Sequence, residues 1–182
     1  KILQEINPVS IEVPSSTLEF TAINPYSAFQ MFAGETYELL SQRLPVVAYE
    51  SVDGTNLFLG KFYLSSWKNL GDTKVEFQAI DMIGVLAEMM YDGGFWETAT
   101  SLDTILDTIL GQVGVEYNLD SSLDSVELSG WIPPCTYREA LQHICFAAGA
   151  VAKTSRSSVI EILPTSIPDT TYSQQVTDSE KS

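Results

Sequence analysis

The sequence predicts an α+β protein in which a barrel-like antiparallel sheet is followed by a small domain of helices and strands. Two observations predict this class. Up to about residue 80, short runs of alternating apolar and polar residues are separated by turn signals. Beyond Gly93-Gly94, apolar residues recur at helical spacing. We therefore expect a β-rich domain over 1–95, an α+β domain over 96–165, and a polar tail or linker over 166–182.

Four runs in the first half predict strands, at 15–23, 44–50, 57–67 and 74–80. Short turns between neighbouring runs favour antiparallel pairing. The inward-facing residues should be Leu18, Phe20 and Ala22 in the first run, Phe58, Gly60, Phe62 and Leu64 in the third, and Val75, Phe77 and Ala79 in the fourth.

Turn residues separate these strands. Asp53-Gly54 predicts the hairpin turn after the second run, and Gly71-Asp72 the turn before the fourth. Gly60, inside the third run, indicates a bulge or tight bend. The interruption between residues 24 and 43 should carry a short helix ending near Arg43.

Three helices are predicted by their capping residues and apolar stripes. Asp81 should cap a short helix over 82–90, with Ile83, Leu86, Ala87 and Met90 on one side. Ser101 should cap a second helix, whose end Gly111 and Gly114 mark.

Thr136 and Glu139 have the spacing of a capping box, which predicts a third helix ended by Gly149. Segment 115–119 should be a strand. Segments 150–153 and 158–164 should form a hairpin packed on the third helix.

The charge balance argues against several classes of partner. The chain has 182 residues, 24 acidic and 9 basic, with net charge -15. Such a chain repels phosphate backbones and anionic membrane surfaces, so nucleic-acid and membrane functions are disfavoured. No apolar run approaches the roughly 20 residues of a spanning helix. No basic-then-apolar leader follows Lys1, so no signal peptide is predicted and the chain reads as a trimmed fragment.

The acidity is concentrated in one stretch. Between Lys74 and Arg138 there is no basic residue, while eleven acidic residues occur: Glu76, Asp81, Glu88, Asp92, Glu97, Asp103, Asp107, Glu116, Asp120, Asp124 and Glu127. This stretch is a candidate electrostatic guide for a basic partner subunit.

Reactive residues are few and poorly placed for catalysis. His143, the single histidine, should lie on the helix face opposite Cys145, which disfavours a Cys-His nucleophilic pair. Cys135 precedes the same helix without a visible base. Asp103 and Asp107 share a helix face, but no third ligand is positioned, so a solvated face is favoured over a metal site. We predict no enzyme activity, no metal and no cofactor.

Aromatic residues near the domain junction are the candidate contact residues for a ligand or partner. Tyr91, Phe95 and Trp96 could form a sugar-stacking platform, although packing between the two halves is the favoured interpretation. Trp131 is a further candidate.

Five segments, in order, resemble phage and prophage tail proteins of the baseplate hub or tail-associated type. They are "SSTLEFTAIN", "YELLSQRLPVVAYE", "LGKFYLSSWKNLGDTKVEFQAIDMIGVLAE", "SLDTILDTILGQVGVEY" and "TYREALQHICFAAGAVAKTSRSSVIEILP". Their order and spacing, over residues 10 to 165, carry the resemblance.

The resemblance implies a barrel-like domain and a small α+β domain within a larger hub protein that often forms rings or trimers. It implies a place in the virion tail, assembled in the bacterial cytoplasm, with other tail or baseplate subunits as partners. It implies no catalytic residues. The function expected is thus structural, through protein–protein assembly.

Two alternatives stay open. One is a carbohydrate-binding or cell-wall-hydrolysing module that uses Trp96 or Trp131 with nearby acids. The other is a secreted adhesin-like domain, which the free thiols and the lack of a leader disfavour.

Overall fold

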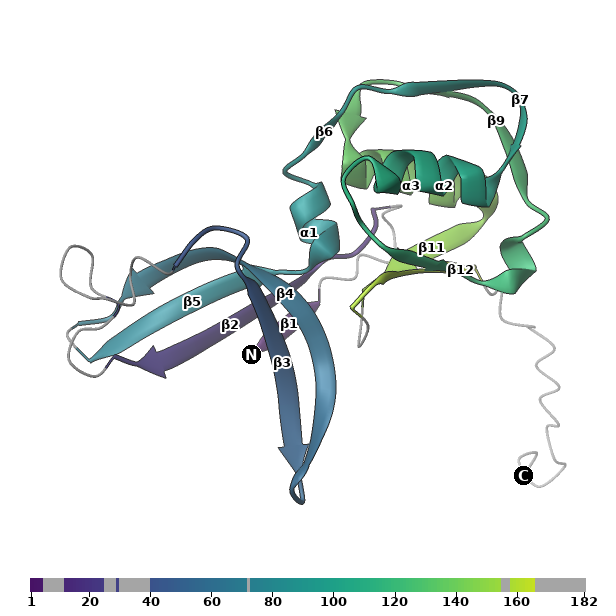
Figure 1. Cartoon of the computed structure of the whole chain (residues 1–182). Coiled ribbons are helices and arrows are strands. Elements are labelled where there is room, and N and C mark those ends of the chain that lie inside the picture. The colour runs from purple at the N-terminus through teal and green to yellow at the C-terminus, as the bar shows by residue number, and fades with distance from the viewer. Residues whose placement is uncertain (5–11, 25–28, 30–39, 72, 155–157, 166–182) are drawn as a thin grey trace, which may run out of the picture.

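The computed structural model describes residues 1–182 except 5–11, 25–28, 30–39, 72, 155–157 and 166–182. Figure 1 shows a curled sheet in the first half and a body of helices and strands in the second, joined through the short helix α1. The helix predicted within 24–43 lies largely outside the described residues, and the tail at 166–182 lies wholly outside them. Among the described helices, none is long and apolar enough to cross a membrane.

The first half forms a five-stranded antiparallel sheet in the order β1-β2-β5-β4-β3. Its strands are β1 (Ile2–Gln4), β2 (Ser16–Ile23), β3 (Pro45–Val52), β4 (Thr55–Asn69) and β5 (Lys74–Ile80). The sheet curls into a half-barrel (Figure 1), which confirms the predicted α+β class and its barrel-like first part. Strand β1 was not predicted.

One face of this sheet is apolar, as the alternation of residues predicts. Val75, Phe77 and Ala79 of β5 are buried, and so are Phe62 and Leu64 of β4. They form two small clusters rather than one continuous core.

One predicted inward residue is less covered than expected. Phe20 is about one third exposed, although its ring stacks on Phe77 with centroids 5.0 Å apart. Its neighbours on β2 follow the prediction better, with Leu18 buried and Ala22 half-buried. The face is therefore incompletely covered at Phe20, in the middle of β2.

Strands β3 and β4 continue beyond the sheet as a two-stranded hairpin, which we call the arm (residues 45–62; Figure 1). Its turn is the predicted Asp53-Gly54 pair, with φ of 50° and 79°. Two consecutive positive φ values give the type of two-residue turn that matches strand twist. The predicted irregularity at Gly60 is also present, because Ala48 pairs with Gly60 and Tyr49 with Phe58, leaving Leu59 as a bulge.

The two halves meet at Asp81, a residue that is 2% exposed. It accepts hydrogen bonds from the Ser16 backbone N–H (2.8 Å), the Gly84 backbone N–H (2.8 Å) and the Thr154 hydroxyl (2.7 Å). The Gly84 bond makes Asp81 the predicted N-cap of α1. One side chain thus connects the first sheet, α1 and the last hairpin.

Helix α1 is shorter than predicted, spanning Met82–Leu86 instead of 82–90. The chain leaves the helix because Met90 and Tyr91 form β6, which pairs with Thr136 and Cys135. Met90 is 68% exposed, so its predicted place on the buried side of the helix is wrong.

The second half contains two longer helices and several short strands. Its elements after β6 (Met90–Tyr91) are β7 (Gly94–Ser101), α2 (Leu102–Gly111), β8 (Tyr117–Leu119), the 3₁₀ turn η3 (Ser121–Leu123), β9 (Glu127–Ile132), β10 (Cys135–Thr136), α3 (Tyr137–Ala148), β11 (Ala150–Lys153) and β12 (Ile160–Pro164). Strands β7 and β9 pair as an antiparallel ribbon that the sequence did not predict.

The predicted caps of the two longer helices are confirmed. The Ser101 hydroxyl accepts from the Thr104 N–H, and Thr136 and Glu139 form the reciprocal capping box. Gly149 ends α3 with φ of 64°. Each cap contributes about 1 kcal/mol.

The predicted hairpin of β11 and β12 packs on α3, and β8 joins β12 in parallel. The core between these layers is formed by fully buried residues of α2, α3 and β12, such as Leu106, Ile109, Leu141, Ile160 and Ile162. Ile83 and Leu86 of α1, and Tyr91, belong to the same core. The division at 95/96 remains a prediction, and α1 contributes to the second body.

Candidate functional site

The ribbon of β7 and β9 carries the aromatic residues singled out in the sequence. Phe95 pairs with Trp131 across the two strands, and Trp96 pairs with Gly130. Since side chains alternate along a strand, each pair lies on its own face. Phe95 and Trp131 point outward and are 69% and 67% exposed, while Trp96 packs against the core.

Gly94 allows Trp96 to fold back on the chain. A Cβ at this position would overlap the Tyr91 hydroxyl and would lie 2.7 Å from the Trp96 ring. Only glycine therefore fits here without a shift of both rings. The close approach positions Trp96 beneath the ribbon, where it forms part of a pocket.

Tyr91 is the one predicted contact residue that the fold buries. It is 3% exposed, and its ring lies 5.3 Å from that of Tyr137. Burial raises the pKa of its hydroxyl. Tyr91 thus supports the core below the ribbon, while Phe95, Trp96 and Trp131 reach the surface or the pocket.

The pocket lies between β9 and α3 and has a volume of about 340 Å³. Trp96 and Trp131 line one side, and His143 and Ala147 of α3 line the other. Its lining is mostly apolar, with His143 as a titratable group at an exposed position. A pocket of this size and chemistry suits an apolar side chain or small ligand group.

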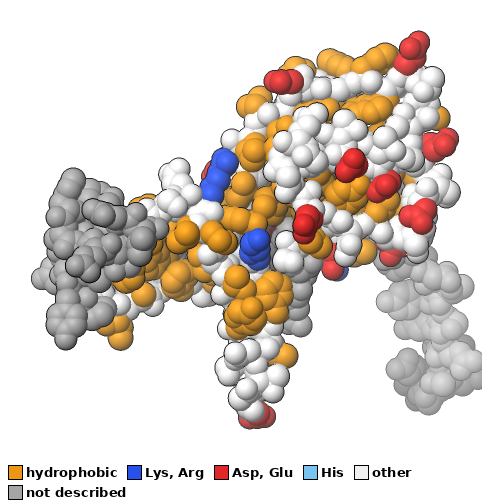
Figure 2. Space-filling model, in the orientation of Figure 1, with side chains coloured by type: hydrophobic (Ala, Val, Ile, Leu, Met, Phe, Trp, Pro, Cys, Tyr) orange, Lys and Arg blue, Asp and Glu red, His pale blue; other side chains and the backbone are white. Residues whose placement is uncertain are grey.

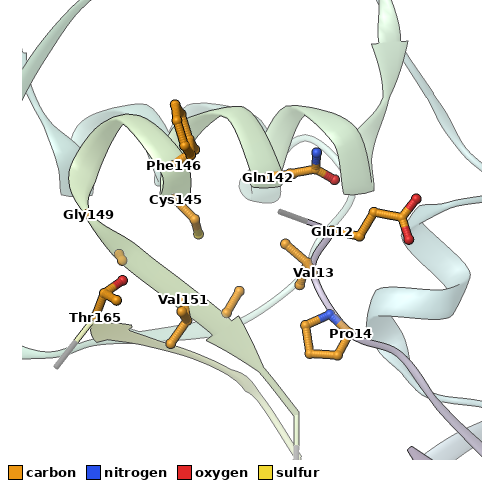
Figure 3. Close-up of a pocket in the computed structure, with 11 residues that line it drawn as sticks. Glu12, Val13, Pro14, Gln142, Cys145, Phe146, Gly149, Val151 and Thr165 are labelled. Carbon is orange, nitrogen blue, oxygen red and sulfur yellow. The ribbon is translucent and has the colours of Figure 1, made fainter. Parts of the chain in front are cut away.

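A second groove, of about 500 Å³, lies on the other side of α3 (Figure 3). Figure 3 shows Cys145 of α3 pointing toward Val151 of β11, with Val13 and Pro14 at the side of the groove and the Phe146 ring directed away from Val151.

The Arg138 guanidinium fixes the wall of this groove formed by residues 12–14. It donates two hydrogen bonds to the Val13 carbonyl, at 3.0 and 2.7 Å. The connector before β2 is thereby held against α3.

The thiols and the histidine are arranged as the helix periodicity predicts. Cys145 is buried, and burial raises its pKa to about 12. His143 is exposed and lines the pocket on the opposite side of α3. Burial, and next the charge of Glu139, raise the pKa of the Cys135 thiol, which disfavours its thiolate form.

Asp103, one of the two aspartates on α2, has a hydrogen-bond partner in β8. The Tyr117 hydroxyl donates to Asp103 Oδ1 at 2.8 Å, while Asp103 and Asp107 are both exposed. Desolvation and this hydrogen bond raise the Tyr117 pKa. Within the described residues, no group of three or more His, Cys, Asp or Glu side chains could hold a metal ion.

Three solved structures share this fold. No family model matches the chain. No curated protein matches it in sequence either. The 43 kDa tail protein of prophage MuSo2 from Shewanella oneidensis aligns with 85% of the chain, with a TM-score of 0.53 and 13% identity. The fold is one found in prophage tail proteins.

Two further tail proteins agree with this result. Prophage tail protein gp18 from Listeria monocytogenes EGD-e aligns with 90% of the chain at a TM-score of 0.52 and 11% identity. The tail protein from Neisseria meningitidis MC58 aligns with 88% at a TM-score of 0.52 and 15% identity. The chain covers 48%, 43% and 44% of the three proteins, so it spans less than half the length of each.

Sequence reasoning missed other exposed apolar residues. Phe146 is 69% exposed beside the second groove, and Tyr49 and Leu57 are exposed on the arm. Phe146 interrupts the polar face of an amphipathic helix, which is a signal visible in the sequence. The exposure of the arm depends on the point at which β5 stops pairing with β4, which no local pattern reports.

Proposed function

We propose that this chain is a structural component of a phage or prophage tail that works through protein–protein assembly. The observation that carries the proposal is the fold shared with three tail proteins over 85–90% of the chain. The order of the strand and helix segments, which resembles tail proteins in sequence, supports it independently.

The half-barrel supports an assembly role. Within the described residues, β1 and β3 are edge strands, and the arm exposes Val47, Tyr49 and Leu57. Unpaired strand edges and exposed apolar side chains are features that natural proteins cover with a partner or another segment. The arm is thus a second candidate contact region, besides the ribbon.

We place the protein at the baseplate hub and expect a trimer of the full-length protein. The support is the resemblance to hub and tail-associated proteins over residues 10 to 165. The location would be the virion tail. The acidic charge supports protein partners over nucleic acid or anionic membranes.

The role we propose is non-enzymatic. The described thiols have raised pKa values, and His143 lies across α3 from Cys145. Neither arrangement supplies an activated nucleophile.

A carbohydrate-binding or cell-wall-hydrolysing module is the second candidate. The exposed Phe95–Trp131 pair favours it, since sugar rings stack on such aromatic surfaces. A glycan array probed with the wild type and with Trp131→Ala distinguishes the candidates. Binding that depends on Trp131 would favour the carbohydrate module.

The direct test is the composition of phage particles. Particles would be induced from the bacterium that encodes the chain, purified, and analysed by mass spectrometry and by gold-labelled antibody in the electron microscope. We expect the label at the tail end distal to the capsid. Its absence from purified tails would overturn the proposal. Light scattering of the full-length protein tests the trimer, and monomer alone at high concentration would contradict it.

A further inference from the structure

The outer face of the β7–β9 ribbon combines an aromatic pair with two carboxylates. Along β9 the side chains on this face are Glu127, Ser129 and Trp131, and Phe95 of β7 lies opposite Trp131. Glu97 follows Phe95 at the point where the pairing of β7 with β9 becomes irregular, between Trp96 and Thr100. All five are exposed. At about 3.3 Å per residue, Glu127 lies roughly 13 Å from Trp131 along β9.

The described segment that contains the ribbon, from 75 to 137, carries no Lys or Arg. The two described basic residues that follow it have other partners, because Arg138 binds the Val13 carbonyl and Lys153 pairs with Glu161 at 3.4 Å. Figure 2 shows hydrophobic side chains along the top of the molecule, over the ribbon, with acidic side chains at both ends of that row.

The pocket beside Trp131 adds an anchor position. Trp131 borders both the outer face and the 340 Å³ pocket, whose opposite wall is α3. Interfaces derive most of their affinity from an apolar or aromatic group buried in such a pocket, surrounded by polar contacts.

We propose that this face binds a basic segment of another tail protein. An apolar side chain of the segment enters the pocket against Trp96 and Trp131. Its Lys or Arg side chains stack on the exposed rings and pair with Glu97 and Glu127. The inference rests on the proposed tail function and adds the surface and the chemistry of its partner.

Charge complementarity selects this occupant. A second copy of the chain also has net charge -15, so two such faces repel each other. A neutral glycan would use the rings but gain nothing from the net charge. A guanidinium group would use both the rings and the carboxylates of the face, since it stacks on aromatic rings and forms charged hydrogen bonds with carboxylates.

The test uses an array of overlapping 15-residue peptides that covers the other tail proteins of the same phage. The whole chain is the probe, and the strongest peptides are then titrated in solution. We expect the binding peptides to carry net positive charge and an apolar residue. Affinity should fall with salt, because the carboxylates are exposed.

Variants assign the binding to the face. Trp131→Ser should weaken binding about tenfold or more, as expected for an anchor residue. The pair Glu97→Gln and Glu127→Gln should weaken it roughly three- to tenfold and reduce the salt dependence. The controls are Phe146→Ser, an exposed aromatic on the other groove, and Asp107→Asn with Glu116→Gln, two exposed acidic residues outside the ribbon. The controls should bind like wild type.

Several results would overturn the inference. These are neutral or acidic binding peptides, a charge variant that binds like wild type, glycan binding through Trp131, or self-association through this face. Absence of any binding peptide has the same effect. The particle analysis separates this failure from that of the proposed function, since the chain would still be found in tails if only the assigned face were wrong.

Discussion

The Thr154 hydroxyl donates a 2.7 Å hydrogen bond to the Asp81 carboxylate, although 73 positions separate the two residues in the chain. This bond joins the end of β11 to the helix cap that follows the first sheet. A single hydroxyl therefore couples the packing of the two halves. Since the acceptor is a buried charged group, loss of the donor should be costly.

Thr154→Val should lower the free energy of unfolding by about 1–3 kcal/mol, because it removes the donor and keeps the side-chain shape. Urea denaturation followed by circular dichroism measures the change. Thr98→Val, at an exposed position on β7, is the control and should change stability by less than about 0.5 kcal/mol. Equal effects of the two substitutions would contradict the role of this bond.

Asp81 should make stability depend on pH in a defined direction. Burial raises its pKa above the ordinary value of 3.8, while hydrogen bonds from Thr154, Gly84 and Ser16 partly oppose the shift. The folded state therefore binds the proton more tightly than the unfolded state. This contribution is fully present below the unfolded pKa and is lost as pH rises through the folded pKa.

The comparison with Asp81→Asn isolates this effect from the other acids, which both proteins share. We expect wild type to gain stability relative to Asp81→Asn as pH falls from 7 toward 4. Unfolding free energies at four pH values in that range measure the difference. A difference that stays constant would show that the pKa of Asp81 is not raised.

Arg138 should stabilise the connector against α3. Arg138→Met keeps the apolar stem but loses both hydrogen bonds to the Val13 carbonyl, so it should cost about 1.5–3 kcal/mol. The stability of Arg138→Lys should lie between that of the wild type and that of Arg138→Met, because an ammonium group can donate to the carbonyl but lacks the paired donors of a guanidinium group. The control is Lys153→Met, which breaks a partly exposed ion pair and should cost less than about 1 kcal/mol. Chemical denaturation of the three variants tests the order.

Two glycines should respond in opposite directions to the same substitution. Gly54 has φ of 79° in the arm turn, so Gly54→Ala should cost about 1–2 kcal/mol. Gly111 is helical, and a Cβ there meets only Asp107 Oδ1 at 3.7 Å. Gly111→Ala should therefore stabilise the protein by up to about 1 kcal/mol. Thermal unfolding of both variants provides the test, and a shift of the same sign in both would contradict it.

Cys145 should be unreactive in the folded protein. Its pKa is raised to about 12 by burial, so almost no thiolate exists at pH 8. Labelling with a thiol-reactive disulfide reagent at pH 8 should modify Cys145 more slowly than Cys135, which is only partly buried. In denaturant both thiols should react at similar rates. Rapid native labelling of Cys145, located by mass spectrometry, would contradict this expectation.

The strands of the half-barrel could be predicted from sequence because one face of that sheet is buried. Burial of one face imposes period-2 alternation, which is visible in Val75, Phe77 and Ala79. The helix caps at Ser101 and Thr136 are local features and could be predicted equally well. Sequence signals of this kind depend only on near neighbours.

The β7–β9 ribbon could not be predicted for the opposite reason. Trp96 pairs with Gly130 across the whole of α2, and no turn joins the two strands. The predicted end of α1 was wrong for the same reason, since Met90 lies outside the helix and pairs with Thr136. In both cases a long-range pairing overrides local propensity.

The candidate site shows the same division. Aromatic residue type alone identified Phe95, Trp96 and Trp131, which lie at the surface or pocket. Tyr91 has the same chemistry, but its pairing with Cys135 turns it into the core beside Tyr137. Which face a short strand presents is decided by its partner, and this information is absent from the strand itself.

The geometry of β4 separates the length of the arm from the pairing of the sheet. Strand β5 pairs with β4 only over Tyr63–Asn69, and β3 pairs with Thr55–Tyr63. Consider two residues inserted into β3 and two into β4, both between the Val46–Phe62 pair and the turn. They would move the turn outward by about 7 Å without disturbing the register of β4 with β5. The reach of the arm can therefore differ while the half-barrel keeps its strand pairing.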